Sequence, residues 1–250
     1  MRNFLNELKY ANRNMSTVTK IILGVIVLYM LLTIKHSDIF SIPFLISIVV
    51  LLTSISLHEI AHGFAAYLLG DNTAKSYGRI SLNPLHHIDP LGLLFPILMA
   101  IIHSPFLIGW AKPVPIDYSR LKYGRFGEFI VAIAGILINF LILIAACIVL
   151  KLFYGKINSF YFGYTIAAIY KINILLIVLN LLPVPPLDGS KILAAIAPQS
   201  LREMIFYLDR FGILIIIFLG WSGILDDAIW TGVKFFNTII NYIWWLIWIQ

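Results

Sequence analysis

The chain has 250 residues, of which 60% are hydrophobic and 12% charged, and its mean hydropathy is +0.93. A soluble domain of this length has about a quarter of its residues charged, so the composition excludes a water-soluble globule and predicts an integral membrane protein. The net charge of +6 is not a sign of nucleic-acid binding, because the Lys and Arg residues flank apolar runs, as membrane proteins arrange them.

Apolar runs that can cross a bilayer as helices recur along the chain. A helix needs about 20 apolar residues to span the hydrocarbon core, and we therefore expect an all-α membrane protein with about six spans, near Ile21–Ile34, Ile42–Leu69, Phe126–Phe153, Tyr161–Leu182, Ile205–Leu225 and Ile229–Ile249. The sixth run carries a polar stripe, which also suits a helix lying along the membrane interface. The run Leu91–Ile102 is too short to cross and predicts a re-entrant or hairpin segment between the second and third spans.

The distribution of positive charge predicts the orientation of these spans. With a cytoplasmic N-terminus, twelve Lys and Arg residues fall on the cytoplasmic side, and only Lys35, Lys151 and Lys156 fall outside. This bias follows the positive-inside rule. The second span then ends at the cytoplasmic face.

The second predicted span contains His58-Glu59-Ile60-Ala61-His62, which has the pattern H-E-x-x-H. Residues four apart share one face of a helix, so both imidazoles can reach one zinc ion at about 2.0–2.1 Å, with Glu59 beside it as a general base for water. Random placement would give this pattern on the order of 0.002 times in such a chain. Ionisable residues at membrane depth are costly and mark function, so the motif predicts zinc-dependent hydrolysis.

A catalytic zinc needs a third protein ligand, and Glu128, Asp188 and Asp209 are the carboxylates near membrane level. Asp188 ends a proline-rich stretch after a span, where irregular backbone must be buried or line a wet cavity. It would serve equally well as the N-cap of a short helix over Ser190–Ala197. Glu128 is the rival ligand, and Asp209 is expected to pair with a nearby arginine. The residues alone leave Asp188 and Glu128 open.

The chain resembles the site-2 proteases, zinc metalloproteases that cut transmembrane helices within the bilayer. Three segments carry the resemblance, in the order of the family: His58–His62, Gly109–Pro115 and Asn180–Gly189. One departure is Ile136, since the family usually has proline after the glycine at this point, and we expect a less kinked helix here. The resemblance implies one Zn²⁺ held by His58, His62 and Asp188, with Glu59 as general base.

The resemblance also implies roles around the zinc site. Asn139 and Asn180 would hold the substrate backbone or the oxyanion, with hydrogen bonding between helices as the alternative role. Lys112, Pro113 and Pro115 would belong to a membrane-dipping loop or hairpin that binds substrate, by strand addition. We expect one metalloprotease domain over residues 1–250, with a catalytic core at about 42–190.

The implied function is regulated intramembrane proteolysis of transmembrane protein substrates in the lipid bilayer of the cell membrane, with the active site open to the cytoplasm. We expect no separate regulatory domain, so substrate choice would rest on the membrane part, the basic N-terminal segment or a membrane partner or adaptor. Two alternatives stand beside it. One is a membrane metalloprotease that cuts segments outside the membrane, with Glu128 as third ligand, and the other is a catalytically silent metal-binding membrane protein.

Overall fold

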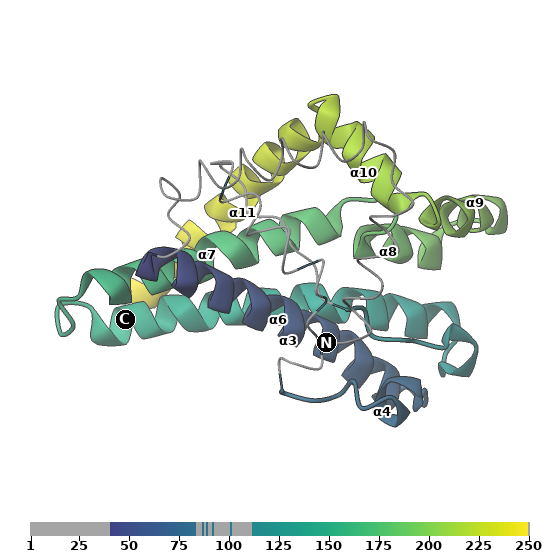
Figure 1. Ribbon diagram of the computed structural model, residues 1–250, viewed down its shortest axis with the longest axis horizontal. Coiled ribbons are helices and arrows are strands. Elements are labelled where there is room, and N and C mark those ends of the chain that lie inside the picture. The colour runs from purple at the N-terminus through teal and green to yellow at the C-terminus, as the bar shows by residue number, and fades with distance from the viewer. Residues whose placement is uncertain are drawn as a thin grey trace, which may run out of the picture.

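The computed structural model describes residues 41–83, 87, 89, 92, 101 and 112–249, and within these ranges the chain is helical without a β-strand (Figure 1). The expected first span Ile21–Ile34, nearly all of the expected re-entrant run Leu91–Ile102, and Gly109–Ala111 lie outside the described residues.

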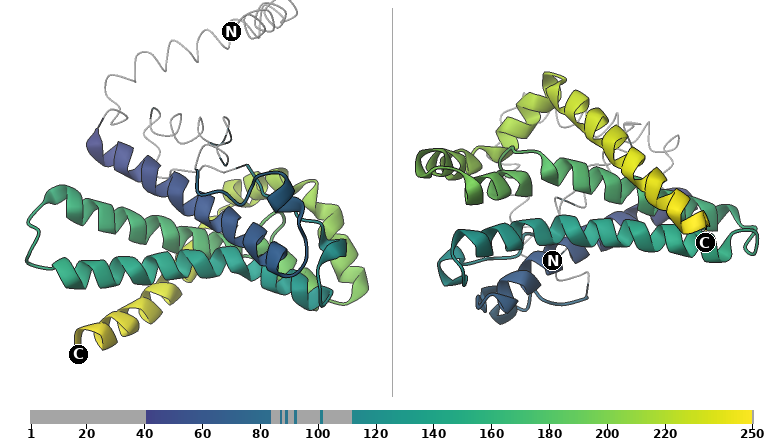
Figure 2. Two further views of the ribbon diagram at one scale, coloured as in Figure 1. Left: turned by 90° about the horizontal axis from the view of Figure 1, so that it is seen from below. Right: turned by 180° about the vertical axis from the view of Figure 1, so that it is seen from behind.

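Three of the described helices are long and apolar enough to cross a membrane: α3 (Ile42–Leu68), α6 (Arg125–Phe153) and α7 (Phe160–Leu181). Their bounds agree within one residue with the second, third and fourth predicted spans. The three helices pack against one another, and α3 crosses the other two at an angle (Figure 2). Only 33, 33 and 28% of their most apolar windows are buried, and apolar side chains cover the outer faces. The protein is therefore built as a membrane protein.

The core of this bundle lies between α6, α7 and the last helix, α11 (Ile224–Ile249). Its buried side chains are Ile136, Leu143, Cys147, Ile174, Ile177 and Ile240. The polar stripe expected on the last helix faces α7 in part, because the Tyr170 hydroxyl donates a 2.5 Å hydrogen bond to Oδ1 of Asn237. α11 is not one of the three candidate spans among the described residues.

The single span expected over Ile205–Leu225 is instead two helices. α9 (Gln199–Asp209) and α10 (Gly212–Trp221) meet at 84°. α9 is amphipathic with charged residues on one side, whereas α10 is apolar throughout. Gly212 lies close to the proline-rich loop before Asp188, since a Cβ at Gly212 would come within 2.5 Å of Cδ of Pro186. The described helices thus supply three candidate spans, or four if the bent pair forms one, and the expected six are not confirmed.

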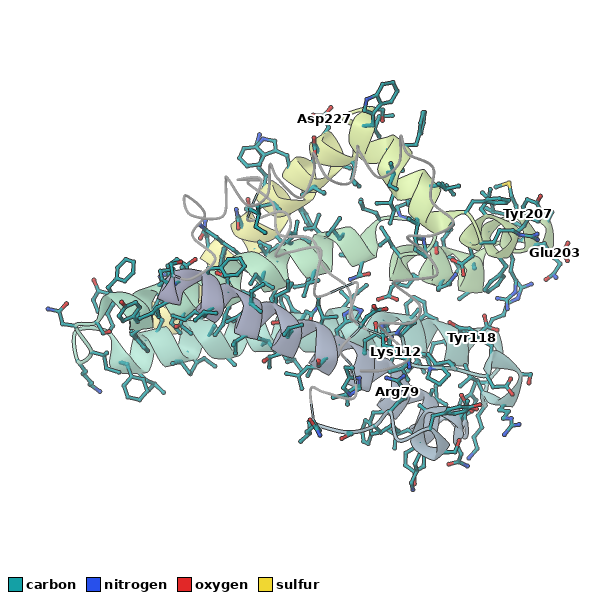
Figure 3. All side chains as sticks on the ribbon, in the orientation of Figure 1. Arg79, Lys112, Tyr118, Glu203, Tyr207 and Asp227 are labelled. Carbon is teal, nitrogen blue, oxygen red and sulfur yellow. The ribbon has the colours of Figure 1, made fainter. Side chains whose placement is uncertain are left out.

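The elements that build the site gather where α3 ends and α6 begins. α4 (Thr73–Ser76) and the 3₁₀ turn η4 (Tyr118–Arg120) lie beside this end, and α8 (Asp188–Ile196) packs along α6 (Figure 1). Gly189 permits the close return of α8 to α7, since a Cβ there would stand 2.5 Å from the Leu181 carbonyl oxygen. Arg79, Lys112 and Tyr118 also lie at this end (Figure 3).

Candidate metal centre

Three side chains from two distant parts of the chain meet at one point. His58 and His62 lie on α3, and Asp188 is the first residue of α8. The two Nε2 atoms are 3.0 Å apart, and Oδ2 of Asp188 lies 3.0 Å from Nε2 of His58 and 3.1 Å from Nε2 of His62. Ligand atoms of a tetrahedral zinc site stand about 3.3 Å apart when each metal–ligand distance is about 2.0–2.1 Å. The spacing and the donor set both fit a zinc ion, and three protein ligands among the described residues is the number that catalytic zinc sites use.

The start of α8 positions Asp188. The helix begins at Asp188 itself, with Leu187 in the capping position, and the Ser190 hydroxyl donates to the Leu187 carbonyl at 2.7 Å. The carboxylate is turned toward the imidazoles of α3. The alternative in which Asp188 caps a helix over Ser190–Ala197 is therefore wrong.

The Nδ1 atoms of both histidines, which lie on the side of each ring away from Asp188, contact α6. Nδ1 of His62 lies 2.7 Å from the Val131 carbonyl oxygen, and Nδ1 of His58 lies 3.1 Å from the side-chain amide of Asn139. Gly135 sits between these two contacts, and a Cβ there would lie 2.5 Å from Cε1 of His58. Glycine at this position lets α6 approach the imidazoles closely. Such outer contacts fix the ring orientation of metal-binding histidines.

Glu59 lies next to His58 on α3 and contacts the segment that leads into η4. Its Oε2 accepts a 2.9 Å hydrogen bond from the Val114 backbone N–H. The N–H of Lys112 is bonded to the His87 carbonyl at 2.8 Å. This part of the predicted substrate-binding loop is therefore beside the expected general base, although the described residues 112–117 form no strand.

Asp71 anchors the same segment and is a residue that the sequence analysis missed. It is fully buried. Its Oδ2 accepts from the Asp117 N–H at 2.8 Å, and its Oδ1 accepts from the N–H of Thr73 at 2.9 Å and from the Thr73 hydroxyl at 2.5 Å. The Asp-x-Thr pattern before a short helix signals such a local turn, but the contact with Asp117 depends on the tertiary fold.

Tyr118 is a second residue that sequence reasoning missed. Its ring packs edge-on to Phe206 of α9 with 6.4 Å between centroids. Burial, together with the carboxylates of Asp188 and Glu128, raises the pKa of Tyr118 to about 12. Its phenol stays protonated at neutral pH and is a hydrogen-bond donor near this end of the bundle.

The remaining predicted residues lie apart from the three converging side chains. Glu128 is buried but paired with Arg202, whose two terminal nitrogens lie 2.6 and 2.9 Å from its oxygens. Within the part of the chain that the structure describes, Asp209 pairs with Lys191 at 2.5 Å and not with an arginine. The Asn180 amide donates at 3.0 Å to the Leu176 carbonyl of its own helix. Lys112 and Pro113 are exposed, and Pro115 is half-buried.

Comparison with known proteins connects the chain to zinc metalloproteases. Residues 154–219, which include Asp188, match the family model described as peptidase family M50. A Bacillus subtilis protein whose name describes a zinc metalloprotease, YwhC, is 30% identical over 194 residues, covering 75% of this chain and 84% of the relative. Rip2 of Mycolicibacterium smegmatis, named in the same way, is 27% identical over 169 residues, covering 67% of this chain and 63% of the relative. No solved structure matches the chain.

Proposed function

Because this chain belongs to the site-2 protease family, peptidase family M50, we propose that it cuts peptide bonds in or near transmembrane segments of membrane protein substrates. The family makes it a membrane zinc metallopeptidase with Zn²⁺ as its cofactor, which confirms the resemblance seen in the sequence. The observation that carries the finer proposal is the convergence of His58, His62 and Asp188 at 3.0–3.1 Å, inside a candidate span and beside Glu59.

The depth of the site supports cleavage within the membrane. His62 lies six residues before the end of α3 at Leu68, which corresponds to about 9 Å along a helix that rises 1.5 Å per residue. His58 lies one turn deeper. A substrate peptide bond that comes close to both histidines must therefore lie inside the membrane. Water must reach the same point through a polar opening.

The chain's own residues supply positioning and proton transfer. His58, His62 and Asp188 would hold the zinc ion, which when bound would act as a Lewis acid toward the attacking water and the scissile carbonyl. Glu59 would take the proton of the attacking water and pass it to the leaving amine. Its bond to Val114 holds one carboxylate oxygen and leaves Oε1 for this transfer.

A substrate helix must unwind locally, since its carbonyls are bonded within the helix. We place the unwound strand along Lys112–Pro115. The N–H groups of Lys112 and Val114 are already bonded, and Pro113 and Pro115 have none. This edge therefore offers only carbonyl oxygens, and substrate N–H groups would donate to them. Replacing both prolines without loss of cleavage would argue against this arrangement.

The charge distribution supports an active site that opens to the cytoplasm. The described end that carries the site also carries a group of basic residues: Lys75, Arg79, Lys112, Arg120, Lys122 and Arg125. Only Lys151 and Lys156 lie at the turn between α6 and α7, at the opposite end. By the positive-inside rule the basic end faces the cytoplasm. We therefore propose that regulated proteolysis takes place on the cytoplasmic side of a cell membrane and that a membrane partner or adaptor directs it.

The two alternatives have less support. A protease that uses Glu128 as third ligand would have to break the pair between Glu128 and Arg202 and displace Asp188 from the histidines. A catalytically silent metal-binding protein needs no carboxylate between the two histidines, yet Glu59 is present and held by Val114.

The test is to reconstitute the protein in liposomes with a single-span substrate that also carries a soluble tail, and to locate the cut by mass spectrometry of the products. We expect cleavage within or next to the hydrophobic segment. Cleavage confined to the soluble tail would contradict the proposal and favour the protease that acts outside the membrane. The Glu59→Gln variant is the inactive control.

A further inference from the structure

We infer that Asn139 is a positioning residue for the zinc site: its side-chain carbonyl accepts the Nδ1–H of His58 and so keeps the Nε2 lone pair of His58 directed at the metal. The inference rests on the proposed zinc site and goes beyond the substrate-binding role that the family resemblance implies for Asn139.

The register between α3 and α6 brings Asn139 to His58. Val131, Gly135 and Asn139 are spaced four residues apart on α6 and share one face, opposite the two histidines that are also four apart on α3. The Val131 carbonyl meets His62, the bare Gly135 allows the approach, and the Asn139 amide meets His58. Each histidine therefore has one outer contact from the same helix.

The chemistry of the metal decides how the Asn139 amide is turned. Nδ2 lies 3.1 Å from Nδ1 of His58, and Oδ1 is buried without a partner among the described residues. The oxygen and nitrogen of an amide are assigned from the hydrogen-bond network. If Nδ2 donated to Nδ1, the ring proton would sit on Nε2 and face His62, Asp188 and the metal. With Oδ1 as the acceptor, the proton sits on Nδ1 and Nε2 is free to bind zinc.

Among the described residues, Asn139 is the hydrogen-bond partner of His58 Nδ1 and therefore sets the tautomer of this ring. Asn139 is fully buried and His58 is 6% exposed, so bulk water cannot substitute for the amide. His62 has the equivalent arrangement, since the Val131 carbonyl can only accept and therefore requires Nδ1–H. Removing an outer partner of a metal-binding histidine typically weakens metal affinity about 10- to 100-fold.

The experiment measures zinc affinity by chelator competition in detergent, for wild type, Asn139→Leu and Asn139→Asp. The aspartate variant keeps an acceptor and loses the donor, whereas the leucine variant loses both. We expect Asn139→Leu to weaken zinc binding about 10- to 100-fold and Asn139→Asp to bind within a few-fold of wild type. Absorption spectra with Co²⁺ in place of zinc should rank the metal affinities of the three proteins in the same order.

Asn173→Leu is the matched control. Asn173 is also fully buried, and it bonds Ser54 on α3 at 3.0 Å, one helical turn before His58, and not one of the three metal-site side chains. We expect it to lower thermal stability without a loss of zinc affinity. Equal loss in Asn139→Asp and Asn139→Leu would overturn the acceptor role, as would wild-type affinity in Asn139→Leu or an equal loss in Asn173→Leu. A wild type that binds zinc but cuts no transmembrane substrate would contradict only the proposed function.

Discussion

The backbone N–H of Val114 donates a 2.9 Å hydrogen bond to Oε2 of Glu59, across 55 positions of the sequence. This contact joins the expected general base to the segment that we propose as the edge for the substrate. The position of Glu59 relative to the metal-site residues therefore depends on how closely this segment packs on α3.

Gly63 sets that packing distance. A Cβ at Gly63 would lie 2.9 Å from Cγ1 of Val114 and 3.2 Å from Cβ of Ala74. We expect Gly63→Ala to push Val114 away from Glu59 and to lower kcat by about 10- to 100-fold, the scale of a misplaced catalytic group, with zinc content unchanged. Adding Val114→Ala removes the clashing Cγ1 and should restore part of the rate. A double variant as slow as the single one would contradict this explanation.

Asp71 should act on the same segment from its other end. In Asp71→Ala the N–H groups of Asp117 and Thr73 lose their acceptor, and each buried donor left without one costs about 1–3 kcal/mol. We expect a lower melting temperature and slower cleavage, with zinc still bound. The check is thermal unfolding together with zinc analysis, and loss of zinc on this substitution would show that Asp71 acts on the metal site.

The roles of the two candidate carboxylates can be separated by substitution. Asp188→Asn should abolish tight zinc binding, because the amide replaces a charged ligand. Glu128→Ala should keep zinc but destabilise the fold by about 3–5 kcal/mol, the scale expected when one partner of a buried ion pair is removed, since Arg202 loses its partner. Zinc analysis and thermal unfolding in detergent distinguish the two roles. Loss of zinc from Glu128→Ala, with zinc kept by Asp188→Asn, would establish Glu128 as the ligand.

Tyr118 predicts a stability change at alkaline pH. Its folded pKa of about 12 lies above the ordinary value of 10, so its contribution is complete below pH 10 and is lost as the pH rises through 12. A shift of this size corresponds to about 3 kcal/mol, at roughly 1.4 kcal/mol per pKa unit. Tyr118→Phe cannot ionise, and its melting temperature should fall less than that of wild type between pH 9 and 11.5. An equal fall in the melting temperature of both proteins would contradict a raised pKa for Tyr118.

Local patterns predicted the long helices and the shared helix face of His58 and His62. Continuous apolar runs placed α3, α6 and α7 within one residue, because the bilayer imposes length and hydropathy together. The i, i+4 spacing of His58 and His62 was enough to bring them to one face of α3. These features depend on residues that are close in sequence.

Features that depend on contacts between residues far apart in the sequence could not be predicted from local patterns. The residues alone left Asp188 and Glu128 open as ligands, and what separates them in the fold is the pairing of Glu128 with Arg202, 74 positions away. The bend between α9 and α10 was missed because a hydropathy window averages an amphipathic helix with an apolar one. The contact of Asn139 with His58 follows from the register of two helices 81 positions apart.

The most direct test of the central claim compares bound zinc and cleavage of a transmembrane substrate in purified wild type and Glu59→Gln. We predict one zinc per chain in both proteins and cleavage by the wild type alone, because the glutamine keeps the shape of the side chain but cannot take a proton. If neither protein binds zinc, the assignment of His58, His62 and Asp188 as a metal centre is contradicted. If Glu59→Gln cleaves as fast as wild type, the role of Glu59 as general base is wrong.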